Sequence, residues 1–531
     1  MTSQTEYLAR RLPGRLRAIA LAVGLAPALL CLQACKSSAE RADALAQQAQ
    51  AQASAGDLAA ARQSIDAAIA LRDDQAAYHT LRGAIAIRDN DTLAAYQSFS
   101  RALEFDATNK LALSYVASIG IQVGQMQEGE DAADRLLAIE PNALAALQVK
   151  GMTALWRDRY DEAMQYADRI LASRPGDEAA AIIKARALVK FDKTEEAIAL
   201  IDNALQTSPN SVGLLMNKLN FYRFLKRPEQ MASVMEQVVR LSSNTPALRL
   251  DQANLLYRLG RMDEARQAGL NLLVMGSRKP EDYRTLQRLW WQYDDKPLSE
   301  AAARTSAKWE DPRAIASTAR YLMLRGDLRT ADILLRSAPE RFEQNFAALR
   351  VRLLAAAGHT AEARKQTEAL LKRDDQDVDA LLLRAQFALQ DGDARKALEA
   401  AQLALTNDPL NPEAYVALVN VYRARGADER ARQIFEDGMR SQPQSFYLVE
   451  QYLRYLRARG DKSRAISLTQ TFARNVPSLP RPWELLGAQC QWAGDQNCLR
   501  KAAEGYNAAK NTYLVDDPPG TTPDRGLLGR L

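Results

Sequence analysis

Residues 412–443 read PEAYVALVNVYRARGADERARQIFEDGMRSQP. Gly426 stands near the middle of this stretch, Ala431 follows five residues later, and Pro443 closes it. Glycine adopts the left-handed conformation that ends a helix without a Cβ penalty, and proline cannot extend a helix. The stretch therefore predicts a helix, a tight turn, a second helix and a stop.

The glycine and the alanine that follows it recur along the chain. Ala363, Ala397, Ala431 and Ala465 follow one another at a constant interval, and steps of this length or slightly shorter reach 14 anchor positions along the chain. The anchors are Ala61, Ala95, Gly129, Ala163, Ala197, Met231, Ala265, Ser299, Ala331, Ala363, Ala397, Ala431, Ala465 and Leu499. Five residues before them stand nine glycines, three aspartates, Asn90 and Lys226. A fixed period of this length indicates a repeat protein, whose units run from residue 42 to residue 513.

The anchor lies early in each second helix, where two backbones approach closely. A large side chain there would overpack the crossing at a cost of about 1–3 kcal/mol. Twelve residues after six of the anchors stand prolines that end the second helix: Pro141, Pro175, Pro209, Pro409, Pro443 and Pro477.

This pattern resembles the tetratricopeptide repeat (TPR) family, whose W-x-x-L-G start appears as Trp483-Glu484-Leu485-Leu486-Gly487. The resemblance implies an all-α fold, an α-solenoid or superhelix of about 14 units. We expect an N-terminal array over 42–299, a C-terminal array over 300–513 and a disordered tail over 514–531. The two shortened steps, which lead from Ser299 through Ala331 to Ala363, predict a bend or junction in that segment.

The first 35 residues resemble the export signal of a bacterial lipoprotein. Four arginines precede an apolar run over residues 18–34, and Leu32-Gln33-Ala34-Cys35 is similar to a lipobox. The resemblance implies a signal peptide over 1–34, a lipid such as palmitate on Cys35, a linker over 35–41, and an outer-membrane location facing the periplasm. The alternative is a plain anchor helix with a fortuitous cysteine. The segment 1–34 carries a net charge of +3 of the chain's +5, so the remainder is nearly neutral.

No Walker loop, dinucleotide fingerprint, nucleophile elbow or H-E-x-x-H helix occurs in the chain. The two histidines, His79 and His359, lie at or near expected repeat boundaries, so packing or surface roles are favoured over catalysis. The sequence therefore predicts a protein that is not an enzyme and has no cofactor and no metal site. Interspersed acids and bases together with export argue against nucleic acid as a partner.

Cys490 and Cys498 fall late in the first helix and early in the second helix of the last unit. A helical hairpin brings such positions together, and an oxidising envelope permits a disulfide. The alternative is a pair of buried thiols.

In the TPR family, partners usually lie along the concave surface, which the ninth residue of each unit faces. That position is occupied by Asn220, Asn254, Arg288, Arg320, Arg352, Gln386, Asn420 and Arg454. Amide and guanidinium groups can bind a peptide backbone, a carboxylate or a sugar hydroxyl. This ladder predicts a site for an extended polar or acidic segment, and a solvated helix face is the alternative.

Trp291 is expected to turn towards the same groove, and Trp290 to pack in the core. The resulting hypothesis is a non-catalytic, lipid-anchored scaffold that binds envelope proteins, with exopolysaccharide export or pilus and secretion-system assembly as the expected settings. The alternative function is a glycan- or peptidoglycan-binding module, in which Trp291 stacks on polysaccharide.

Overall fold

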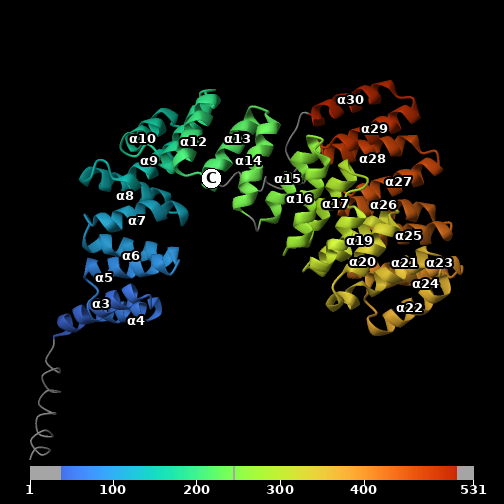
Figure 1. The fold of residues 1–531 in the computed structure, drawn as a ribbon, viewed down its shortest axis with the longest axis horizontal. Coiled ribbons are helices and arrows are strands. Elements are labelled where there is room, and N and C mark those ends of the chain that lie inside the picture. The colour runs from blue at the N-terminus through green and yellow to red at the C-terminus, as the bar shows by residue number, and fades with distance from the viewer. Residues whose placement is uncertain (1–36, 243–244, 511–531) are drawn as a thin grey trace, which may run out of the picture. The chain divides into compact units, whose positions relative to one another are not determined.

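The computed structural model describes residues 37–242 and 245–510. These residues form 28 α-helices and two short 3₁₀ helices, and they contain no β-strand. The chain divides into two compact units, Met1–Pro209 and Asn210–Leu531, here called unit 1 and unit 2. Each unit is an α-solenoid in which consecutive helices pair and consecutive pairs stack (Figure 1).

The described part of unit 1, residues 37–209, contains five helix pairs. Its helices are α3 (Ser38–Ala55), α4 (Leu58–Leu71), α5 (Ala76–Arg88), α6 (Thr92–Phe105), α7 (Lys110–Gln122), α8 (Met126–Ile139), α9 (Leu144–Trp156), α10 (Tyr160–Ser173), α11 (Glu178–Lys190) and α12 (Thr194–Thr207). The helix α3 begins with a capping box, in which Ser37 and Glu40 each accept a hydrogen bond from the other's backbone N–H.

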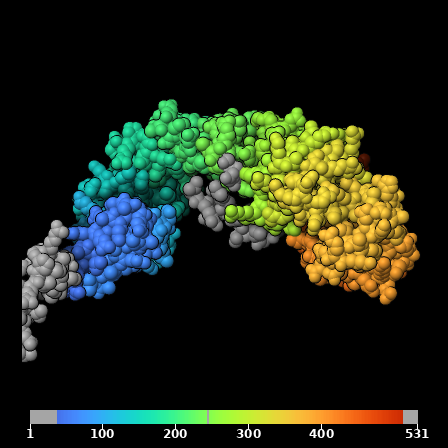
Figure 2. All heavy atoms as spheres, turned by 60° about the horizontal axis from the view of Figure 1, so that its bottom comes forward, coloured from blue at the N-terminus to red at the C-terminus, as the bar shows by residue number. Residues whose placement is uncertain are grey.

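In unit 2, the described residues up to Lys510 form nine helix pairs, one of them irregular. Its helices are α13 (Val212–Phe224), α14 (Pro228–Leu241), α15 (Pro246–Arg258), α16 (Met262–Met275), α17 (Pro280–Tyr293), α18 (Glu300–Arg304), η2 (Thr305–Lys308), α19 (Pro312–Leu324), α20 (Leu328–Ser337), η3 (Glu340–Phe346), α21 (Ala347–Ala356), α22 (Thr360–Arg373), α23 (Val378–Gln390), α24 (Ala394–Asn407), α25 (Pro412–Ala424), α26 (Asp428–Ser441), α27 (Phe446–Ala458), α28 (Lys462–Asn475), α29 (Pro480–Ala493) and α30 (Gln496–Lys510). The yellow and orange helices of this unit form one continuous body in the space-filling view (Figure 2).

The residues predicted to end the first helices adopt, with one exception, the predicted left-handed conformation. All nine glycines that stand five residues before an anchor have a positive φ, and so do Asn90, Asp158, Asp192 and Lys226. Asp294 is the exception, with φ −144°. Its carboxylate is instead buried and accepts hydrogen bonds from Arg266 and Tyr257, so this turn is held by side chains.

The anchor positions and the prolines also act as predicted. The ten anchor alanines have no exposed surface. At Gly129 a Cβ would lie 3.1 Å from the carbonyl oxygen of Ala117, which shows how closely the two helices approach. Each of the six prolines stands two residues after the end of a second helix, as Pro443 does after α26.

The segment from Ser299 to Ala363, for which the shortened steps predict a bend or junction, contains short and irregular helices. Ser299 caps the five-residue helix α18, which η2 follows, and η3 precedes α21. The units themselves divide between Pro209 and Asn210, whereas residues 299 and 300 both lie inside unit 2. The predicted signal peptide over 1–34, the predicted lipid carrier Cys35 and the predicted tail over 514–531 lie outside the described residues.

Candidate functional site

The predicted ladder lies on first helices of unit 2. Its members and Trp291 are distributed over α13 (Asn220), α15 (Asn254), α17 (Arg288 and Trp291), α19 (Arg320), α21 (Arg352), α23 (Gln386), α25 (Asn420) and α27 (Arg454). These residues do not form one uniform row. Asn254 is buried and accepts a hydrogen bond from Arg258 Nε at 3.3 Å, whereas Asn420 and Arg454 are exposed. The Oδ1 atom of Asn220 is buried without a hydrogen-bond partner.

The two central arginines of the ladder are neutralised by acids from other helices. Arg320 Nη2 lies 2.7 Å from Asp379 Oδ2, and Arg352 Nη1 lies 2.8 Å from Asp379 Oδ1. Arg352 also pairs with Glu413 at the start of α25. The side chains of Asp379, Arg352 and Glu413 are 6%, 15% and 14% exposed, so this part of the network is largely withdrawn from water, whereas Arg320 is 36% exposed.

The pKa values of this network follow from its geometry. Burial alone would raise the pKa of Asp379, but the charges of Arg320 and Arg352 and their hydrogen bonds outweigh it and lower that pKa to about 2. Burial likewise opposes the charge on Arg352, yet Glu413 and Asp379 raise its pKa. Asp379 and both arginines are therefore ionised at neutral pH. Arg320 and Arg352 serve as internal cross-links of unit 2, which leaves them less available to a partner than the ladder alone predicts.

A cavity of about 960 Å³ opens between α17 and α19 on one side and the beginnings of α25 and α27 on the other. Its lining includes the aromatic rings of Trp291, Tyr321 and Tyr447 and the exposed guanidinium groups of Arg284 and Arg313. An apolar lining with a few polar groups is typical of a binding site. Arg288 also lines this cavity and donates a hydrogen bond to Gln444, which lies between α26 and α27.

A second cavity of about 510 Å³ is lined by Gln386 and Asn420 of the ladder. Glu413 and Tyr447 line both cavities, so the two adjoin. We call them together the unit 2 groove. This groove brings together Arg288, Trp291, Arg320, Arg352, Gln386 and Asn420, while Asn220, Asn254 and Arg454 do not line it.

Trp291 lines the groove but exposes only 8% of its surface. Its ring contacts the edge of Tyr321 at a centroid distance of 5.7 Å, and the guanidinium carbon of Arg325 lies 4.5 Å from its ring centroid. These contacts occupy the ring and leave little of it for a sugar. Trp290 is 2% exposed, in agreement with its predicted core position.

The ladder prediction did not identify the residues that pair with its arginines or that line the groove beside them. Asp379, Glu413 and Tyr447 are each the second residue of a first helix, and they recur at the interval of the anchors. The same repeat period, applied to the second position rather than the ninth, would have found them. Gln444 lies in the connection between α26 and α27, next to the repeat proline Pro443, at a position that the repeat pattern does not mark.

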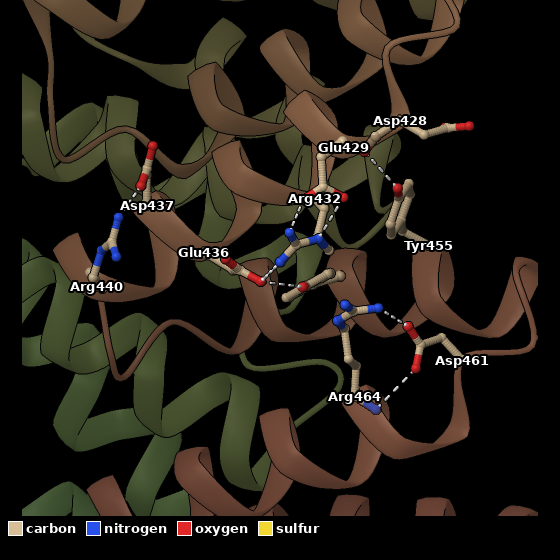
Figure 3. Close-up of polar contacts among 10 residues, drawn as sticks. Asp428, Glu429, Arg432, Glu436, Asp437, Arg440, Tyr455, Asp461 and Arg464 are labelled. Carbon is tan, nitrogen blue, oxygen red and sulfur yellow. Dashed lines mark hydrogen bonds and ion pairs between the residues drawn. The ribbon is translucent and has the colours of Figure 1, made fainter.

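Charged residues of second helices form a separate cluster on α26 and α28. Figure 3 shows Arg432 between Glu429 and Glu436, and Arg464 beside Asp461. Tyr455 of α27 donates a hydrogen bond to the backbone carbonyl of Asp428. Because the charges of this cluster are paired with one another, it is a stabilised surface and offers no vacant site.

The remaining predicted features fall outside the groove. Cys490 and Cys498 form a disulfide with Cα atoms 5.5 Å apart, which joins α29 to α30. His79 is buried, stacks on Phe105 and shares a hydrogen bond with the carbonyl oxygen of Asp73.

In the described part of the chain, no three His, Cys, Asp or Glu side chains are grouped to hold a metal ion. Within that part, too, every helix is too short or too polar to span a membrane.

Stacked helix pairs and a groove are the features of a helical repeat protein that binds a partner. Family models described as tetratricopeptide repeat match residues 349–412 and 388–451, and a model of the Psidin N-terminal TPR repeats region matches residues 152–272. These matches support a tetratricopeptide repeat assignment for the repeats that they cover.

Solved structures of repeat proteins align with parts of the chain. A tetratricopeptide repeat protein from Parabacteroides merdae is 20% identical, with a TM-score of 0.39, over 47% of this chain and 98% of its own. PilF of Pseudomonas aeruginosa is 17% identical, with a TM-score of 0.33, over 40% and 96%. The Naa15/Naa10 complex bound to HypK-THB is 15% identical, with a TM-score of 0.27, over 88% and 75%. No curated protein sequence matches this chain.

Proposed function

We propose that this protein is a non-catalytic scaffold of the bacterial envelope, anchored by a lipid on Cys35, which holds an extended segment of a protein partner in the unit 2 groove. The single observation that carries the proposal is the groove itself, with aromatic rings on its walls and the exposed arginines Arg284 and Arg313 at its side. Aromatic rings supply contact area, and guanidinium groups bind carboxylates and backbone carbonyls.

The glycan-binding alternative has less support. A sugar-stacking platform needs an exposed ring face, and Trp291 is 8% exposed and covered by Tyr321 and Arg325. Exopolysaccharide export and pilus or secretion-system assembly remain the settings that we propose for such a scaffold.

Site-specific photo-crosslinking in cells tests the binding site. Leu410 lines the groove and is 43% exposed, while Leu403 of α24 is 41% exposed and lines neither cavity. With p-benzoylphenylalanine in place of Leu410, we expect a discrete intermolecular adduct with an envelope protein. The same probe in place of Leu403 is the matched control. Equal adducts from both positions, or none from position 410, would contradict the proposal.

The anchor has its own test. A triacylated cysteine holds a protein firmly at a membrane, because each buried methylene contributes about 0.8 kcal/mol. Cys35→Ser should release the protein from the membrane fraction and abolish incorporation of labelled palmitate. A Cys31→Ser variant, which changes the neighbouring cysteine of the apolar run, should retain both. Membrane association that survives Cys35→Ser would favour the plain anchor helix.

A further inference from the structure

The last described turn of α30 lies against the first helices of unit 2. Arg258, at the end of α15, donates hydrogen bonds to the backbone carbonyl of Ala509 at 3.4 Å and to Ser478 Oγ at 3.2 Å. The helix α15 packs against α17, where the rings of Tyr257 and Tyr293 stack at a centroid distance of 5.6 Å. The chain therefore continues beyond Lys510 from a point one repeat away from the groove.

The remaining segment is long enough to reach the groove. Residues 511–531 can span up to about 70 Å when extended. The tether also keeps the segment at an effective concentration on the order of 1 mM near the groove. Even a weak match between segment and groove would therefore give substantial occupancy.

The chemistry of the segment complements the groove. Near its start stand Tyr513-Leu514-Val515, which are followed by Asp516-Asp517 and then by Pro518-Pro519. Proline and the residue before it favour an extended backbone, which suits a narrow groove. The two carboxylates can pair with the exposed guanidinium groups of Arg284 and Arg313 at the side of the groove. Acids also line the groove, but Glu281 is paired with Arg284 and Glu413 with Arg352.

Arg284 is the arginine best placed to receive such a carboxylate. Its side chain is 47% exposed, and its ion-pair partner is Glu281 on the same helix, 3.8 Å away. An exposed pair of this kind contributes little energy, so Arg284 can exchange it for a carboxylate in the groove. Arg313 also lines the groove, but Asp311 holds its guanidinium by two hydrogen bonds.

We infer, on the basis of the function proposed above, that residues 511–531 are an intramolecular occupant of the unit 2 groove, with Asp516 and Asp517 facing Arg284. A protein partner must then displace the chain's own C-terminal segment, so capture is restricted to partners that bind the groove more tightly than this segment does.

The test uses the full chain. The purified protein with p-benzoylphenylalanine in place of Leu410 is irradiated, and intramolecular adducts are mapped by mass spectrometry. In parallel, a fluorescent peptide of residues 511–531 is titrated into the unchanged protein and into the D516K/D517K variant. We expect an adduct between position 410 and residues 511–531, and about tenfold tighter peptide binding by the variant, whose groove is vacated. When Arg284→Glu is added to the D516K/D517K variant, the tighter peptide binding should be lost. When Arg440→Glu on α26 is added instead, the tighter peptide binding should remain.

Each outcome separates this inference from the proposed function. The probe in place of Leu403 again serves as the control. Equal adducts with residues 511–531 from positions 403 and 410 would overturn the inference. Equal peptide affinity of the unchanged protein and the D516K/D517K variant would overturn it as well. A partner adduct at position 410 without an adduct to residues 511–531 would overturn the inference and leave the proposed function in place. An adduct to residues 511–531 without any partner adduct would support the inference and contradict the proposed function.

Discussion

Arg352 and Asp379, 27 residues apart on α21 and α23, form an ion pair of 2.8 Å that is largely withdrawn from water. The same aspartate accepts from Arg320 of α19, and the same arginine reaches Glu413 of α25. One polar network thus connects four successive first helices. Ionised groups in such a place are tolerated because each has a partner. Without the charge of Asp379, the buried Arg352 would keep only Glu413, and Arg320, which is 36% exposed, would lose its carboxylate.

Asp379→Asn should therefore lower the free energy of unfolding by about 3 kcal/mol, since Arg320 and Arg352 would lose their shared carboxylate. The measurement is urea denaturation followed by circular dichroism. Asp437→Asn is the matched control, because Asp437 forms an exposed pair with Arg440 within α26 (Figure 3). Such pairs contribute about 0–1 kcal/mol. Comparable losses from the two variants would show that the buried network carries no special stability.

The network also predicts a dependence of stability on pH. The pKa of Asp379 is lowered to about 2 in the folded protein, against about 3.9 for an unfolded aspartate. A carboxyl group with a depressed folded pKa contributes stability that is complete above the unfolded pKa and is lost as the pH falls through the folded pKa. The stability difference between the native chain and Asp379→Asn should therefore shrink between about pH 5 and pH 2. Denaturation curves at several pH values measure it, and a constant difference would contradict the lowered pKa.

The repeat itself was accessible to sequence reasoning because each of its parts has a local cause. A turn at Gly426 needs a positive φ, an anchor such as Ala431 needs to be small, and a stop such as Pro443 lacks an N–H. All of these requirements are met within a single repeat unit. The exception, Asp294, is held by Arg266, which is 28 residues away, and no local rule predicts that contact.

The groove was only partly predictable for the same reason. The ninth-position rule correctly placed Arg288, Arg320 and Arg352 on first helices, but it assigns a position within a unit and no contact between units. Arg320 meets Asp379 from two repeats further along. That contact depends on how tightly the solenoid curls, which is the sum of many small packing differences.

The anchor position offers a direct test of helix crossing. Ala363 of α22 has no exposed surface and packs with Val351, Leu383 and Phe387. Ala363→Leu should lower the free energy of unfolding by about 1–3 kcal/mol, because the added carbons must displace those neighbours. Ala361, two residues earlier on the same helix, is exposed, and Ala361→Leu should change stability by less than about 0.5 kcal/mol. Chemical denaturation of the two variants compares them, and equal effects would contradict the close crossing.

The disulfide between Cys490 and Cys498 joins the two helices of the last repeat, α29 and α30. In the last described pair, α30 has no following helix to pack against, so a covalent link there limits fraying. We expect the peptide that contains both cysteines to resist alkylation in denaturant without reductant and to take up two alkyl groups after reduction. Reduction should lower stability by about 2 kcal/mol, as expected for a short closed loop. A Cys490→Ser, Cys498→Ser variant should show the lower stability with or without reductant, and alkylation of both thiols before reduction would show that the bond is absent.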